Sequence, residues 1–231
     1  MEPNFGAQIF EWKTGKGTAI AAIIVAILLV VGSIATGEPL AIAGAVLIAI
    51  GFVAATASSL VNTLRCYEHG LVKKNLFGVR QFAYSDVDVL IYQATRVVGV
   101  YAQTNFRLQV VPVKPHRKIS LFGRYREGIE VFRDAVAAAV AKKMLDRLAS
   151  EPEITWSGKV RLSRQGVHFQ KPKFVGSEAV FIPFSENPQV GFDAGTFRLS
   201  GRDLVLRMDV GSPNFFPGYL AMQTLAAAPR P

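Results

Sequence analysis

The side chains best suited to covalent chemistry are one cysteine and three histidines. Cys66 is the only thiol in the 231 residues, and the histidines are His69, His116 and His168. A thiolate beside an imidazole could act as a nucleophile with its base. No spacing among these four residues matches such a motif, and fatty acylation of Cys66 is an alternative reading. We expect structural roles for all four residues and predict that the chain is not an enzyme.

Metal and phosphate chemistry have equally weak signals. Asp86 and Asp88 are two residues apart on an expected strand and so share a face, but no further acidic residues gather near them in sequence. The segment Gly15-Lys16-Gly17-Thr18 lacks the upstream glycine of a phosphate-binding loop. A single cysteine excludes an internal disulfide framework and a four-cysteine zinc site. We predict no metal and no cofactor.

Positive charge is the more informative feature. The chain holds 26 Lys and Arg against 17 Asp and Glu, and most of the excess lies between residues 65 and 150. Such residues are attracted to anionic lipid headgroups, so we predict a headgroup site; the alternative is an ordinary solvated face that also marks membrane topology. Nucleic acid is an unlikely partner because no aromatic and basic residues interleave. The candidate residues are Lys73, Lys74, Arg80, Lys114, Arg117, Lys118 and Arg124.

Two long stretches carry no charge. Gly17 to Gly37 spans 21 residues and Pro39 to Leu64 spans 26, and a helix needs about 20 apolar residues to cross a membrane. We predict a transmembrane hairpin of two helices, about 18–36 and 39–62. A cleaved signal peptide, or two buried helices of a soluble protein, are the alternatives. Basic residues flank both outer ends, which predicts a two-pass inner-membrane (plasma-membrane) protein with both termini in the cytoplasm.

Small residues recur every seven positions along the second of these stretches. Gly44, Gly51 and Ser58 would share one stripe of a helix, where backbones can approach closely. The stripe indicates either a seam between copies of the chain or simple packing of the two helices on each other. Neither stretch contains an ionisable residue, which argues against an ion or proton pathway.

The remainder of the chain alternates like half-buried antiparallel strands. Phe106, Leu108 and Val110, for example, alternate with polar residues. One segment differs, because apolar residues from Ile129 to Leu148 recur at intervals of three and four, which predicts a helix. The pattern then restarts, so we predict four regions: a cytoplasmic segment 1–16, the hairpin 17–64, and modules 65–150 and 151–231.

The two modules share a motif, Phe82-Ala-Tyr-Ser-Asp-Val87 in the first and Phe181-Ile-Pro-Phe-Ser-Glu186 in the second. The layout resembles uncharacterised bacterial membrane proteins in which a helical hairpin precedes tandem pleckstrin-homology-like domains. The resemblance implies an α+β membrane protein with two antiparallel β-sandwich or barrel modules, each ending in a helix. The expected function is a membrane-anchored scaffold or sensor that binds anionic lipid headgroups or a partner protein. The alternative is a subunit of a small oligomeric membrane complex assembled through the hairpin.

Overall fold

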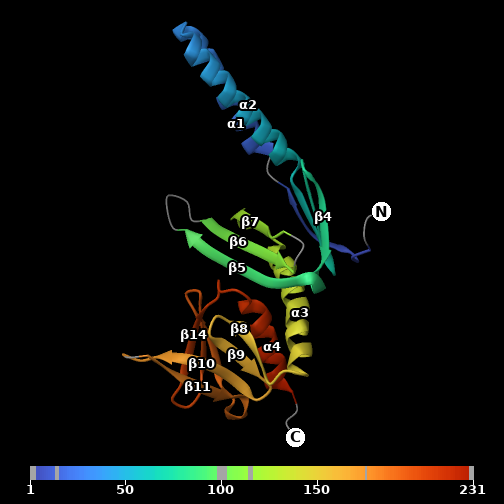
Figure 1. The fold of residues 1–231 in the computed structure, drawn as a ribbon, viewed down its shortest axis with the longest axis vertical. Coiled ribbons are helices and arrows are strands. Elements are labelled where there is room, and N and C mark those ends of the chain that lie inside the picture. Colours follow the sequence, from blue (N-terminus) through green and yellow to red (C-terminus); the bar gives the residue numbers. More distant parts are fainter. Residues whose placement is uncertain (1–3, 14–15, 98–102, 114–116, 175, 229–231) are drawn as a thin grey trace. The chain divides into compact units, whose positions relative to one another are not determined.

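A computed structural model describes residues 4–13, 16–97, 103–113, 117–174 and 176–228 of the chain (Figure 1). The fold is α+β, with helices and antiparallel strands in four separate sheets. The chain divides into two compact units, Met1–Phe82 and Ala83–Pro231. The division falls inside the stretch 65–150 that the sequence groups as one module.

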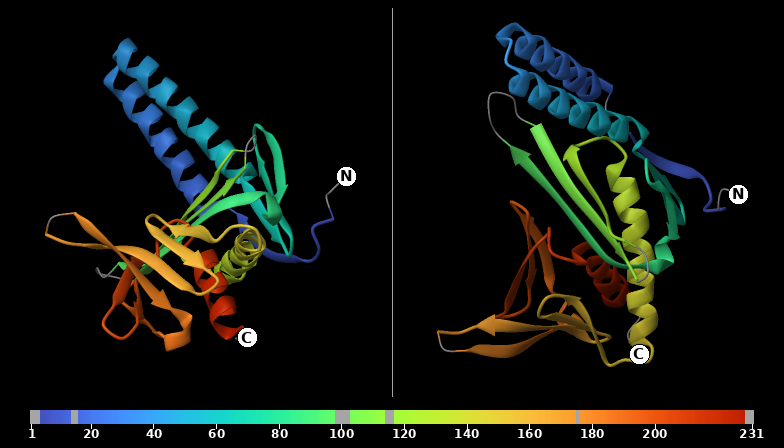
Figure 2. Two further views of the ribbon diagram at one scale, coloured as in Figure 1. Left: turned by 60° about the horizontal axis from the view of Figure 1, so that its bottom comes forward. Right: turned by 45° about the horizontal axis from the view of Figure 1, so that its top comes forward.

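The first unit combines a helical hairpin with a four-stranded sheet. Helices α1 (Lys16–Thr36) and α2 (Pro39–Val61) pack along each other as antiparallel neighbours (Figure 2). Gly37 reverses the chain between them with a φ of 69°, and its N–H donates to the Ile34 carbonyl at 3.1 Å. The sheet has the order β1-β2-β3-β4. Its strands are β1 (Gln8–Lys13), β2 (Thr63–Tyr67), β3 (Gly70–Asn75) and β4 (Gly78–Ala83).

The predicted transmembrane hairpin is wrong. Two helices lie close to the predicted positions, but no helix in the described residues is long and apolar enough to cross a membrane. The prediction rested on two long stretches that carry no charge and are rich in apolar residues. The predicted two-pass inner-membrane location depended on these spans and falls with them.

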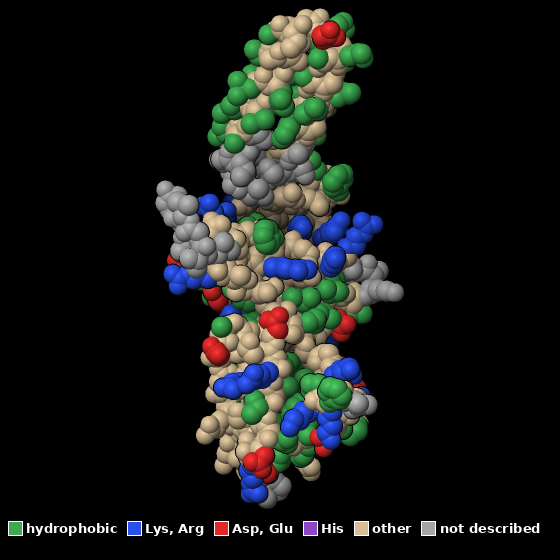
Figure 3. Space-filling model, turned by 90° about the vertical axis from the view of Figure 1, so that its left-hand side faces the viewer, with side chains coloured by type: hydrophobic (Ala, Val, Ile, Leu, Met, Phe, Trp, Pro, Cys, Tyr) green, Lys and Arg blue, Asp and Glu red, His purple; other side chains and the backbone are tan. Residues whose placement is uncertain are grey.

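The hairpin nevertheless exposes much apolar surface. Large apolar side chains of both helices are in contact with solvent, among them Ile20, Leu28, Leu40, Leu47 and Ile50. Figure 3 shows hydrophobic side chains along the face of the α1–α2 hairpin that is drawn.

The second unit contains most of the strands. It runs η1 (Tyr84–Asp86), β5 (Val87–Val97), β6 (Gln103–Pro112), β7 (Ile119–Arg124), α3 (Ile129–Leu148), β8 (Glu153–Ser157), β9 (Val160–Ser163), β10 (Gly166–Pro172), β11 (Ser177–Pro183), η2 (Phe184–Glu186), β12 (Gln189–Asp193), β13 (Thr196–Ser200), β14 (Val205–Asp209) and α4 (Phe215–Ala227). Its sheets have the orders β5-β6-β7, β11-β10-β9-β8 and β12-β13-β14.

One order of elements occurs twice along the chain. A four-stranded sheet is followed by a short 3₁₀ helix, a three-stranded sheet and an α-helix, first ending at α3 and then at α4. Each 3₁₀ helix begins with a buried aromatic residue, Tyr84 in η1 and Phe184 in η2. These residues belong to the motif that the two halves share in sequence.

The predicted helix around 129–148 is confirmed as α3. Ile129, Phe132, Val136, Val140 and Met144 are all buried, as their spacing requires. Gly128 precedes the helix with a φ of 89°, a conformation that glycine adopts without strain. The strand expected at Phe106–Val110 is likewise confirmed, because β6 buries Phe106, Leu108 and Val110 and leaves Arg107 exposed.

The core of the second half is aromatic. The Trp156 ring is fully enclosed and lies 5.6 Å from the Phe197 ring and 6.1 Å from the Phe215 ring, between centroids. Its indole N–H donates to the Phe215 carbonyl at 3.0 Å, which satisfies the buried donor. This core fixes the first turn of α4 against β8 and β13.

Candidate functional site

The β3–β4 hairpin gathers three of the predicted basic residues. Asn75 ends β3, and its side-chain oxygen accepts the Phe77 N–H at 2.9 Å. Gly78 begins β4 with a φ of 124°, which glycine tolerates. A turn of two residues sets the register of an antiparallel hairpin, so Lys73 on β3 lies across from Arg80 on β4.

These cations have no internal counter-charge. In the described part of the chain, Lys73, Lys74 and Arg80 form no ion pair, whereas Lys13 and Arg65 both pair with Glu11, at 2.7 and 3.1 Å. Burial, and then the positive charge of Arg80, lower the pKa of Lys73. The hairpin therefore holds like charges together in a half-buried setting that favours an anion.

Apolar side chains surround the tip of the same hairpin. Leu76 is 50% exposed, Phe77 is 90% exposed and Val79 is 59% exposed. A ligand at this tip would meet cationic groups with apolar surface beside them.

The other predicted basic residues do not join this group. Arg117, Lys118 and Arg124 lie beside or on β7 in the second unit and are exposed, and Lys114 is outside the described residues. Lys118 and Arg124 stand at opposite ends of β7, about 20 Å apart at the usual rise of a strand. The structure places Lys73 beside Arg80 on one face of the β3–β4 hairpin, whereas Lys74, the next residue along β3, points to the opposite face.

The small-residue stripe faces open space. A Cβ atom at Gly44 or at Gly51 would have no neighbour within 4 Å, so neither glycine packs against α1. Packing of the two helices on each other does not explain these glycines. The side chain of Ser58 is outside what the structure describes.

Cys66 is poorly placed for chemistry. Its side chain is completely buried on β2, and burial raises the pKa of its thiol well above the usual range. We therefore expect iodoacetamide at pH 8 to leave Cys66 unmodified in the folded chain and to alkylate it fully in denaturant, as read by mass spectrometry. Rapid alkylation of the folded chain would contradict this burial.

The described histidines and carboxylates do not gather into a metal site. His168 stacks on Phe181 with ring centroids 4.3 Å apart and lies 3.4 Å from a Glu153 oxygen, whereas His69 is exposed near a turn. His116 is outside the described residues. Across the described positions, no three His, Cys, Asp or Glu side chains are grouped so that they could hold a metal ion.

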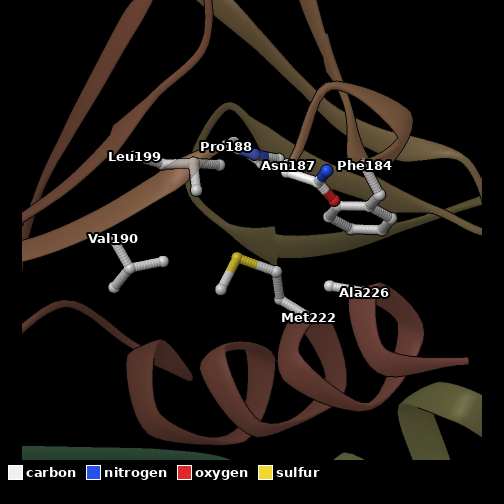
Figure 4. Close-up of a pocket in the computed structure, with 7 residues that line it drawn as sticks. All are labelled: Phe184, Asn187, Pro188, Val190, Leu199, Met222 and Ala226. Atoms are coloured by element: carbon white, nitrogen blue, oxygen red, sulfur yellow. The ribbon is translucent and has the colours of Figure 1, made fainter.

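Sequence reasoning missed one feature, a cavity of about 210 Å³ between β12 and α4 (Figure 4). It is lined by Phe184, Asn187, Pro188, Val190, Leu199, Met222 and Ala226. All but Asn187 are apolar. The local signal in the sequence was the alternation of Val190 and Phe192 with Gly191 and Asp193. The structure shows that both apolar residues are exposed.

Comparison with known proteins gives a family but no activity. No curated protein and no solved structure matches the chain. A family model described as a family of unknown function (DUF6585) matches residues 2–186, which include both helices of the hairpin and the β3–β4 turn. The match does not address the resemblance to pleckstrin-homology-like domains, which stays a prediction. The chain belongs to the DUF6585 family.

Proposed function

We propose that the chain is a non-enzymatic binding protein and that its β3–β4 hairpin binds an anionic, phosphate-bearing headgroup. The observation that carries the proposal is the neighbouring pair Lys73 and Arg80, which forms no ion pair within the described residues. Proteins usually pair or solvate neighbouring cations, and crowding them costs stability. A phosphate group would supply the missing charge.

The chemistry of the two side chains suits such a ligand. The Arg80 guanidinium can donate two parallel hydrogen bonds to a phosphate, and Lys73 on the same face adds a mobile ammonium donor. A bound anion would also offset the two causes that lower the pKa of Lys73, burial and the charge of Arg80.

Calorimetric titration of the full-length chain tests this proposal. The probe is inositol hexakisphosphate, with inorganic phosphate as the minimal ligand. We expect saturable binding that weakens at least tenfold in Lys73→Gln/Arg80→Gln, because each lost cation near an anionic target costs about 1 kcal/mol. Binding should also weaken as salt is added.

The matched control is Arg117→Gln/Lys118→Gln, which removes two exposed cations of the other unit. It should bind like the wild type. Equal loss in both double variants would show attraction to net charge alone and would contradict a site at the hairpin. So would the absence of saturable binding at low salt.

Vesicles distinguish a free from a lipid-borne headgroup. Co-sedimentation compares neutral vesicles with vesicles that contain anionic lipid. Dependence on Lys73 and Arg80 in both the vesicle and the free-headgroup assay would identify a lipid-borne ligand. Dependence in the free-headgroup assay alone would identify a free one.

A second candidate function is self-association through the α1–α2 hairpin. Single proteins rarely expose contiguous apolar patches above a few hundred Å², and a stable dimer buries roughly 800 Å² on each partner. Both helices expose large apolar side chains throughout their described lengths, and Gly44 and Gly51 leave open space for a close neighbour. A second copy would cover apolar surface with apolar surface and would bring no unpaired charge.

Light scattering after gel filtration of the full-length chain tests self-association. We expect a defined oligomer that dissociates in Gly44→Leu/Gly51→Leu, because the added side chains would hold the helices apart. Gly32→Leu on α1 is the control, since Gly32 also has open space around it but lies off the stripe. A monomer, or a chain recovered only when lipid or detergent covers the hairpin, would contradict this candidate.

A further inference from the structure

The edge of the β12-β13-β14 sheet is open. In the described residues β12 pairs only with β13, so the backbone groups on its other side have no strand beside them. Val190 is 43% exposed and Phe192 is 56% exposed on this strand. An unpaired edge with exposed apolar residues is a template on which another strand can pair.

One side of this edge strand faces helix α4. Val190 lines the cavity together with Met222 (Figure 4). The Phe192 ring meets the Tyr219 ring edge-on, with centroids 5.5 Å apart. Leu199 from β13 and Met222 from α4 are buried and line the same cavity. The strand edge therefore runs beside an apolar cavity that is larger than the roughly 150 Å³ cavity known to hold benzene.

The other side of the sheet carries two neighbouring arginines, with Asp193 and Asp209 in the next row on the same face. Gly191 pairs with Arg198 of β13, and Arg198 pairs with Arg207 of β14, so the three residues lie in one row across the sheet. Like charges directly opposite each other are unfavourable. Neither arginine has an ion-pair partner among the residues that the structure describes.

Gly191 opens this row toward the strand edge. It has no side chain, and a Cβ there would meet only the Arg198 Cβ, at 4.0 Å. The next strand position would lie about 4.8 Å beyond β12, within reach of an arginine side chain that extends over Gly191. A carboxylate at that position would pair with Arg198 and relieve its repulsion with Arg207.

We infer that β12 and α4 bind an extended segment of a partner protein, which adds as a fourth strand to the edge of β12. The segment has the pattern apolar–acidic–apolar. Its apolar side chains enter the cavity beside Val190 and Phe192, and its carboxylate lies opposite Gly191, next to Arg198. This interaction involves different residues from the β3–β4 hairpin and does not depend on the headgroup proposal.

Fluorescence anisotropy with the full-length chain tests this inference. The probe is a labelled, capped octapeptide, Ser-Thr-Leu-Glu-Leu-Thr-Ser-Gly, and the comparison peptide replaces Glu with Lys. We expect saturable binding of the Glu peptide and at least tenfold weaker binding of the Lys peptide. Hydrogen exchange of the backbone amides of β12 should slow when the Glu peptide is present.

Two variants locate the interaction. Val190→Asp places a charge in the groove and should weaken binding of the Glu peptide at least tenfold. Val205→Asp is the matched control, because Val205 is 45% exposed on β14 at the opposite edge of the same sheet. Arg198→Glu should reverse the preference, so that the Lys peptide binds more tightly than the Glu peptide.

The inference is overturned if neither peptide binds saturably at millimolar concentration. Equal weakening by Val190→Asp and Val205→Asp would also overturn it, since the groove would then have no special role. If Arg198→Glu still prefers the Glu peptide, the peptide carboxylate does not pair with Arg198. If hydrogen exchange of the β12 amides is unchanged, the peptide does not add as a strand to β12.

Discussion

Replacing Gly218 with alanine is expected to destabilise the Ala83–Pro231 unit by about 3 kcal/mol or more. A Cβ at this position in α4 would overlap the five-membered ring of Trp156. The ring has no room to move, because it lies against Phe197 and Phe215 and its N–H is committed to the Phe215 carbonyl. The helix would have to shift away from β8, which opens the aromatic core.

Denaturant unfolding, followed by circular dichroism, measures this effect. Gly191→Ala is the control, because its new methyl group would touch only the Arg198 Cβ at 4.0 Å. We expect the control to change the free energy of unfolding by less than about 1 kcal/mol. A Gly218→Ala variant as stable as the wild type would contradict the close packing of α4 on Trp156.

Replacing Asn214 with alanine is the second large expected effect, a loss of about 2–4 kcal/mol in unfolding free energy. Asn214 precedes α4 and ties it to β5: its side-chain oxygen accepts the Leu90 N–H at 2.8 Å, and its amide donates to the Asp88 carbonyl at 3.1 Å. Its backbone N–H also donates to the Leu90 carbonyl at 2.7 Å. Its φ of 57° is a conformation that asparagine tolerates better than alanine.

A series of substitutions separates these causes. Asn214→Gly should recover about 1 kcal/mol relative to alanine, because glycine adopts the same backbone without strain. Asn214→Asp should also be more stable than Asn214→Ala, because it keeps the acceptor for the Leu90 N–H and loses only the donor to the Asp88 carbonyl. Equal stability of the wild type and Asn214→Ala in denaturant melts would show that these bonds contribute nothing.

The periodicity of apolar residues predicted those helices and strands whose pattern lies within one continuous stretch of sequence. The apolar stripe of α3 and the alternation of β6 each lie within one stretch of sequence, so periodicity was enough. The first strand was missed. Residues 8–13 give a weak pattern alone, and β1 exists because it pairs with β2, which lies beyond the whole helical hairpin.

The candidate sites likewise differ in whether their residues are near each other in the sequence. Lys73 and Arg80 meet through a two-residue turn, so their proximity could be read from sequence. The residues around the cavity could not, because Val190, Leu199 and Met222 come from two strands and a helix. The membrane prediction is a separate error, because no helix in the described residues is long and apolar enough to cross a membrane.

Thermal unfolding with and without inositol hexakisphosphate tests the central claim, that the β3–β4 hairpin is a binding site for anions. We predict that the ligand raises the melting temperature of the full-length chain by several degrees, because it binds the folded state only. Lys73→Gln/Arg80→Gln should melt no lower than the wild type without ligand, since it removes a repulsion, and should gain nothing from the ligand. An equal gain in both proteins, or a variant that is much less stable alone, would contradict the account.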